Sequence, residues 1–134
     1  MLNLDLRRIL MVEDDPDIQT VAQFALQAIG GFQVQVCGDG RTALEQSRSF
    51  SPDLILLDVM MPDMDGPTVL KRLRANPCTD HIPVVFMTAK VQPNEITQFL
   101  RLGVLDVIAK PFDPMTLAHL LTKIWERAHV VKAH

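Results

Sequence analysis

Short apolar runs alternate with helix-period segments five times along the chain, and this alternation limits the fold more than any other feature. The runs are Ile9–Val12, Phe32–Val36, Leu54–Leu57, Pro83–Met87 and Asp106–Ala109. Leu54–Leu57 is apolar without interruption, which is typical of a strand buried on both faces. Phe32, Val34 and Val36 alternate with polar residues, which indicates a strand near an edge. Strands that alternate with helices form a parallel sheet covered on both faces and joined by right-handed crossovers.

The segments between the runs carry helix start and stop signals. Asp15 is a good N-cap with Pro16 at the first helical position, and Gly30-Gly31 should end a helix expected over Pro16–Ile29. Its buried stripe should comprise Ile18, Val21, Ala22, Ala25, Leu26 and Ile29. Further helices are expected over Arg41–Arg48, Gly66–Ala75, Asn94–Leu102 and from Asp113-Pro114 to about Ala128. The apolar residues expected to be mostly core are Ile96, Phe99 and Leu100 in the fourth helix and Leu117, Leu120, Leu121, Ile124 and Trp125 in the fifth.

Composition narrows the class of protein. The 134 residues, 48% of them hydrophobic, suit one domain with a single core over about residues 8–128 and no output domain. A net charge of -3 argues against direct nucleic-acid binding. Residues 1–8 lack a signal-peptide core, and the apolar runs are too short for membrane insertion. The two cysteines, Cys37 and Cys78, indicate no disulfide or metal framework. Because free thiols suit a reducing compartment, we expect a cytoplasmic protein.

Polar side chains directly follow four of the runs, and any chemistry should depend on them. They are Glu13, Asp14 and Asp15 after the first run, Asp58 after the third, Thr88 after the fourth and Lys110 after the fifth. Ligands of such sheets bind beyond the carboxyl ends of the strands, so these groups should converge. Gathered carboxylates repel one another unless a proton or a cation neutralises them. Acidic oxygen ligands without His or Cys favour a hard cation, and we expect Mg²⁺.

The expected pocket suits phosphoryl transfer. Mg²⁺ would lie on Glu13, Asp14 and Asp58, and Asp58 is the expected nucleophile because it ends the most buried strand. Lys110 and the metal would neutralise charge on the phosphoryl oxygens, and Thr88 would donate a hydrogen bond to them. Considered singly, Asp58 could be a turn residue, Thr88 an ordinary hydroxyl at a strand end and Lys110 a surface charge. Their joint placement favours one site, whereas Asp15 is explained by helix capping.

At this point the chain resembles the receiver domain of two-component response regulators, from Arg8 to about Ala128. The motifs that carry the resemblance are Ile9–Asp15, Asp58–Gly66, Met87–Ala89 and Lys110–Phe112. The resemblance implies a flavodoxin-like fold with strand order 2-1-3-4-5. It also implies that the Lys110–Pro111 peptide bond is cis.

The resemblance assigns roles to individual residues. Glu13 and Asp14 match the acidic metal-binding pair, and Asp58 matches the phosphorylated aspartate. Met60 should contribute its backbone carbonyl oxygen to the metal. Thr88 and Lys110 match the switch hydroxyl and the lysine that pairs with the phosphoryl group.

The implied activity is signalling rather than enzymatic turnover. A histidine kinase or a histidine phosphotransfer protein should donate a phosphoryl group to Asp58, giving an acyl phosphate that hydrolysis removes. Thr88 and Lys110 should then alter the face made by the fourth helix, the fifth strand and the fifth helix. That face would regulate a downstream protein partner or form a homodimer.

One residue departs from the family pattern. The family usually has Tyr or Phe three residues before the lysine, and here that residue is Val107, which leaves the form of the output change open. A vestigial, unphosphorylated module is one alternative. A haloacid-dehalogenase-type phosphatase would need a second acid where Met60 stands. A flavin-binding flavodoxin would need a phosphate-cradling loop where this chain has three acids.

Overall fold

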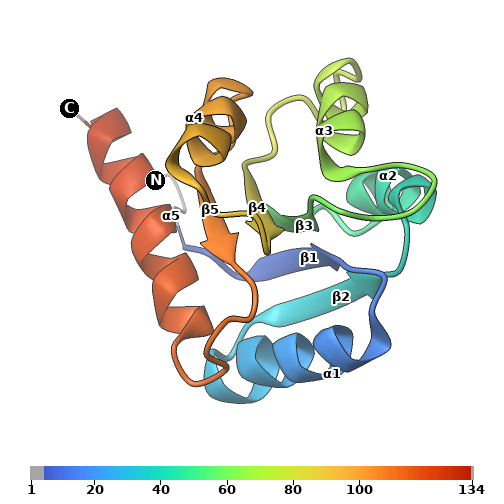
Figure 1. Ribbon diagram of the computed structural model, residues 1–134. Helices are drawn as coiled ribbons and strands as arrows, with labels where there is room; N and C mark the ends of the chain where they lie inside the picture. Colours follow the sequence, from blue (N-terminus) through green and yellow to red (C-terminus); the bar gives the residue numbers. More distant parts are fainter. Residues whose placement is uncertain (1–4, 134) are drawn as a thin grey trace.

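The computed structural model describes residues 5–133, with side chains described through residue 129, and it shows one parallel sheet between two layers of helices (Figure 1). The strands are β1 (Arg8–Val12), β2 (Gln33–Cys37), β3 (Leu54–Asp58), β4 (Val84–Thr88) and β5 (Asp106–Ala109). Their order is β2-β1-β3-β4-β5, and every pairing is parallel. The predicted strand order is therefore confirmed, with β2 at an edge as its alternating pattern indicates.

Each face of the sheet buries its own apolar cluster. The helices are α1 (Pro16–Phe24), α2 (Gly40–Ser49), α3 (Gly66–Arg74), α4 (Pro93–Arg101) and α5 (Leu117–Ala133). Helices α1 and α5 cover one face, while α2, α3 and α4 lie against the other (Figure 1). All five residues of β3 are buried, as its uninterrupted apolar run predicts. No helix within residues 5–133 is long and apolar enough to span a bilayer.

The first helix differs from its prediction in its last turn. A π-helical segment, η1 (Ala25–Ile29), follows α1, and the N–H of Gly30 donates to the carbonyl of Ala25 five residues back. The wider turn rotates Ile29 off the buried stripe, so this side chain is 40% exposed. Val21 is 42% exposed as well, because it lies at the margin of the stripe. The expectation that both residues are buried is wrong.

Two later helices also differ from their predictions. Asp113 does begin a capped turn, accepting a hydrogen bond from the N–H of Met115, but regular helix starts only at Leu117 and continues to Ala133. Trp125 is buried, as predicted, while Leu120 is 40% exposed. None of the nine residues of α4, all of them described, is buried. The expectation of a core stripe on the fourth helix is therefore wrong.

A close backbone approach fixes the start of α3 beside the end of β3. The N–H of Gly66 donates to the carbonyl of Val59 at 2.9 Å. A Cβ at Gly66 would lie 2.8 Å from the carbonyl oxygen of Asp58 and 2.9 Å from the Cα of Val59. Both contacts are to backbone, which cannot move aside as a flexible side chain can. Glycine at this position therefore holds the loop after β3 tightly against Asp58.

We expect Gly66→Ala to destabilise the protein by about 1–3 kcal/mol, because the added methyl group must push the backbone at Asp58 away. Urea unfolding followed by circular dichroism measures the change. Gly38→Ala is the matched control, since a Cβ there would make an ordinary 3.6 Å contact with Gln19. The control should change stability by less than about 0.5 kcal/mol. Equal stability of the two variants would contradict the role assigned to Gly66.

Candidate phosphoacceptor site

The loop after β1 turns the first acid inward and the second outward. Glu13 is fully buried, and its N–H donates to the carbonyl of Cys37 at 3.0 Å, which extends the pairing of β1 with β2. Asp14 is exposed. Asp15 accepts a hydrogen bond from the N–H of Asp17 at 2.8 Å, so its predicted capping role is confirmed. The acids of this loop thus divide between the pocket and the helix start.

Asp58 ends β3 with its carboxylate enclosed. The residue is fully buried, and Oδ1 accepts a hydrogen bond from the N–H of Met60 at 3.3 Å. Oδ2 is buried as well and has no hydrogen-bond partner among the described residues. A buried carboxylate oxygen without a donor is costly, so the structure leaves one acceptor of Asp58 free for a further group.

Lys110 reaches both buried acids from the end of β5. Its Nζ lies 3.0 Å from Oε1 of Glu13 and 3.1 Å from Oδ1 of Asp58. The backbone N–H of Lys110 donates to the carbonyl of Thr88 at 2.9 Å. The Lys110–Pro111 bond is cis, which confirms that prediction. One ammonium group therefore faces two carboxylates at this edge of the sheet.

Burial and hydrogen bonds shift the proton affinities of this cluster. Burial raises the pKa of Glu13 to about 7, aided by the charge of Asp58 and opposed by hydrogen bonds from Asp15 and Lys110. Burial alone would lower the pKa of Lys110, but hydrogen bonds to Glu13 and Asp58 raise it overall. Since Glu13 starts from 4.5 when unfolded, its contribution to stability is lost as the pH rises from 4.5 to about 7.

The acids are close enough to share one cation. Carboxylate oxygens of Glu13, Asp14 and Asp58 lie within 4.8 Å of one another. Together with the unpartnered Oδ2 of Asp58, this donor set fits a hard divalent ion, because such ions prefer oxygen ligands. The structure thus brings together the acids and the lysine predicted from the sequence.

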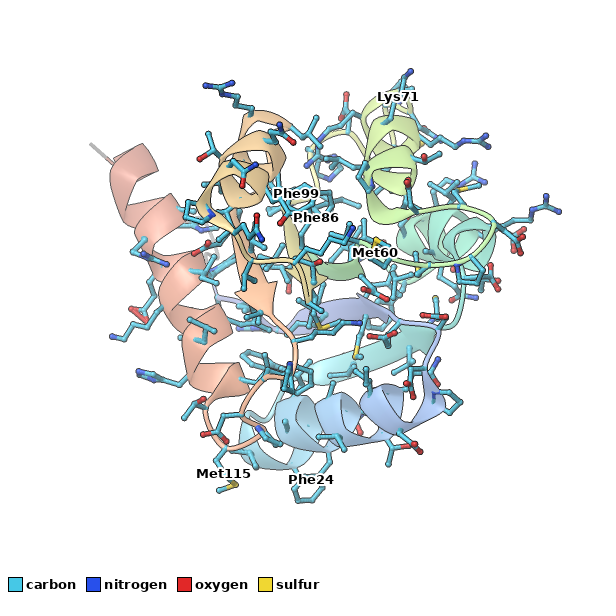
Figure 2. All side chains as sticks on the ribbon, viewed as in Figure 1. Phe24, Met60, Lys71, Phe86, Phe99 and Met115 are labelled. Carbon is cyan, nitrogen blue, oxygen red and sulfur yellow. The ribbon has the colours of Figure 1, made fainter. Side chains whose placement is uncertain are left out.

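The remaining predicted residues are Thr88 and Met60. Thr88 is fully buried at the end of β4, and its Oγ1 accepts a hydrogen bond from the N–H of Lys90 at 3.0 Å. Met60 is 57% exposed, and its side chain stands in the loop after β3 (Figure 2). Lys90 is exposed too. Thr88 is tied to the loop that follows β4.

Gln19 is a positioning residue that the sequence did not reveal. Its Nε2, on α1, donates to the backbone carbonyl of Glu13 and so ties the helix to the acidic loop. The two residues are six positions apart in the sequence, and no local pattern predicts this contact for a glutamine. Only the packing of α1 against the loop makes the contact visible.

A parallel sheet of order β2-β1-β3-β4-β5, with buried acids, a lysine and a buried threonine at its carboxyl edge, defines a phosphoacceptor switch. The family model described as the response regulator receiver domain matches residues 9–122. The chain belongs to this family, and it is a two-component receiver domain.

Relatives and solved structures agree with this assignment. The chain is 40% identical over 111 residues to the DNA-binding response regulator MtrA of Mycolicibacterium smegmatis, covering 83% of this chain and 47% of that protein. It is 36% identical over 103 residues to a probable cyclic di-GMP phosphodiesterase of Vibrio cholerae, covering 77% and 23%. The chemotaxis response regulator CheY4 of Vibrio cholerae superposes with a TM-score of 0.81 at 28% identity, covering 90% and 99%. The chain spans about half or less of the curated relatives it matches.

We expect Asp58→Asn to raise the free energy of unfolding in the absence of metal by about 1 kcal/mol, because it removes a buried charge beside Glu13. The gain should be larger near pH 8 than near pH 6, since Glu13 ionises as the pH passes about 7. Urea unfolding at the two pH values in EDTA measures this. A variant less stable than the parent at both would show that Lys110 fully compensates the two acids.

Proposed function

We propose that Asp58 is the residue that accepts the phosphoryl group. The supporting observation is a buried carboxylate whose Oδ1 lies 3.1 Å from the ammonium of Lys110 and whose Oδ2 has no hydrogen-bond partner among the described residues. An oxygen of Asp58 would attack phosphorus, forming an O–P bond while the bond from phosphorus to the donor breaks. The leaving group keeps that electron pair. Lys110 already lies where it can neutralise charge on the phosphoryl oxygens.

The proposed cofactor is Mg²⁺. Glu13, Asp14 and Asp58 would hold it, with the backbone carbonyl of Met60 as a further oxygen ligand. When bound, the ion would supply positive charge against the phosphoryl oxygens. Gln19 would keep the Glu13 backbone in place while the acids change their partners.

Thr88 is the proposed reporter of the phosphorylated state. Its hydroxyl oxygen accepts from Lys90, and its hydroxyl hydrogen can be donated to a phosphoryl oxygen. Phosphorylation adds roughly -1.5 to -2 units of charge in place of the carboxylate charge. Thr88 and Lys110 precede α4 and α5, so their movement would alter the α4–β5–α5 face. Hydrolysis of the acyl phosphate would return the face to its first state.

The proposed donor is a histidine kinase or a histidine phosphotransfer protein. A hollow of about 390 Å³ is lined mostly by apolar residues, together with two charged ones: Ile18, Val21, Pro111 and Phe112, with Asp17 and Lys110. Such an apolar surface next to the acceptor suits a protein donor better than a small one, since exposed apolar patches commonly contact other proteins. The output would pass to a protein partner or a second copy of the chain, without direct nucleic-acid contact.

Residues 1–134 are proposed to act as one receiver unit. The location proposed for it is the cytoplasm, whose reducing conditions suit the free thiols of Cys37 and Cys78. Burial raises the pKa of the Cys37 thiol to about 11, which fits a packing role. A phosphatase of the haloacid-dehalogenase type is disfavoured because exposed Met60 stands where its second acid is needed.

Acetyl phosphate with Mg²⁺ tests the acceptor directly. We expect intact-mass measurement to show a labile gain of one phosphoryl group, lost on hydroxylamine treatment. Asp58→Asn should abolish the gain, whereas Asp63→Asn, a loop acid, should keep it. A gain that survives Asp58→Asn would mean that another residue is the acceptor.

The lifetime of the phosphorylated state offers a second test. Met60 and Lys90 are exposed, and we expect them to flank the path of the attacking water. Exchanging either residue should therefore change the rate of hydrolysis more than the rate of phosphorylation. We expect the hydrolysis rate to change by about three- to tenfold, which corresponds to a modest shift in the activation free energy of hydrolysis. Loss of radiolabel after removal of the donor gives the hydrolysis rate. Equal lifetimes across the variants would contradict this expectation.

A further inference from the structure

Helix α4 buries little of its surface against the sheet. None of its nine residues is buried, and its N-cap, Gln92, makes no side-chain capping hydrogen bond. Leu100 is 43% exposed, and Leu102, which follows the helix, is 49% exposed. Phe99 is the side chain of α4 that packs against the buried cluster on this face of the sheet.

Phe99 makes its contact on the strand that carries Thr88. Its ring meets the ring of Phe86 edge to face, with centroids 5.4 Å apart and planes at 89° (Figure 2). Phe86 is fully buried and precedes Thr88 by two residues, so both side chains project to the same side of β4. Val107 lies opposite Phe86 in the register of β5 and packs against the same cluster. Because valine is small, we infer that the ring of Phe99, rather than the side chain of Val107, covers the outer side of Phe86.

The loop before α4 is also held to β4. Thr88 holds the N–H of Lys90 at 3.0 Å, and only Val91 and Gln92 separate Lys90 from the first residue of the helix. A rotation of Thr88 would release this N–H. The ring contact of Phe99 is therefore on Phe86, and the hydrogen bond of the loop before α4 is on Thr88, two residues further along β4.

We propose that the contact of Phe99 with Phe86 is the two-state element of this receiver. This proposal rests on phosphorylation of Asp58. Helix α4 is docked through Phe99 while Thr88 holds Lys90. It undocks when Thr88 turns to the phosphoryl group and the loop shifts. Val107 takes no part beyond leaving space, so the moving aromatic ring belongs to α4 rather than to β5.

Hydrogen exchange of peptides that cover residues 90–103 tests this, with and without acetyl phosphate and Mg²⁺. In the parent protein, phosphorylation should speed exchange in α4 by about three- to tenfold, the range that loss of one aromatic pair allows. Phe99→Leu should exchange fast in both states and respond little to phosphorylation. Phe99→Tyr should restore the response, because the ring is kept and its edge is partly exposed. Leu102→Ala is the control and should respond as the parent does.

The outcomes separate the two proposals. Intact mass is read on the same samples, and a mass gain in every variant shows that phosphorylation itself is unaffected. A mass gain with unchanged α4 exchange in the parent, or a full response in Phe99→Leu, overturns the role of Phe99 alone. No mass gain in the parent overturns the proposed acceptor and this inference with it.

Discussion

The pairing of one lysine with two buried carboxylates is the interaction on which the site depends. Lys110 lies within 3.1 Å of both Glu13 and Asp58, yet one positive charge cannot balance the acids gathered there. Burial raises the pKa of Glu13 to about 7, the charge of Asp58 adds to this effect, and Oδ2 of Asp58 has no hydrogen-bond partner among the described residues. Buried acids in excess of nearby positive charge cost stability, and this arrangement supports the proposal that the carboxylate of Asp58 takes a cation and a phosphoryl group.

Much of this arrangement can be predicted from the sequence because its causes are local. Strand burial follows from uninterrupted or alternating apolar residues, and helix starts follow from an acid before a proline, as at Asp15-Pro16. Once the strand order is set, residues that directly follow strands must meet at one edge. The strand order alone was therefore enough to predict that Glu13, Asp58 and Lys110 lie close together.

The features that the sequence missed depend on contacts between distant segments. The π-turn that exposes Ile29 shows no local signal, and Gln19 reaches Glu13 only once α1 has packed. Helix α4 has the apolar spacing of a buried helix, with Ile96, Phe99 and Leu100, but its place beside the sheet leaves none of these residues fully buried. Periodicity shows which face of a helix is apolar, and tertiary packing decides how much of it is buried.

The unequal anchoring of the last two helices determines where a local charge change can have an effect. Helix α5 buries Leu117, Leu121, Ile124 and Trp125, so moving it would expose a large apolar area. Helix α4 has no fully buried residue, and its interactions include the aromatic contact of Phe99 and the hydrogen bond from Lys90 to Thr88 in the loop before it. A phosphoryl group contributes only a few new hydrogen bonds, so we expect the response in the weakly buried α4 rather than in the well-buried α5. This difference in burial is the reason for proposing α4, rather than α5, as the part of the output face that responds most to phosphorylation.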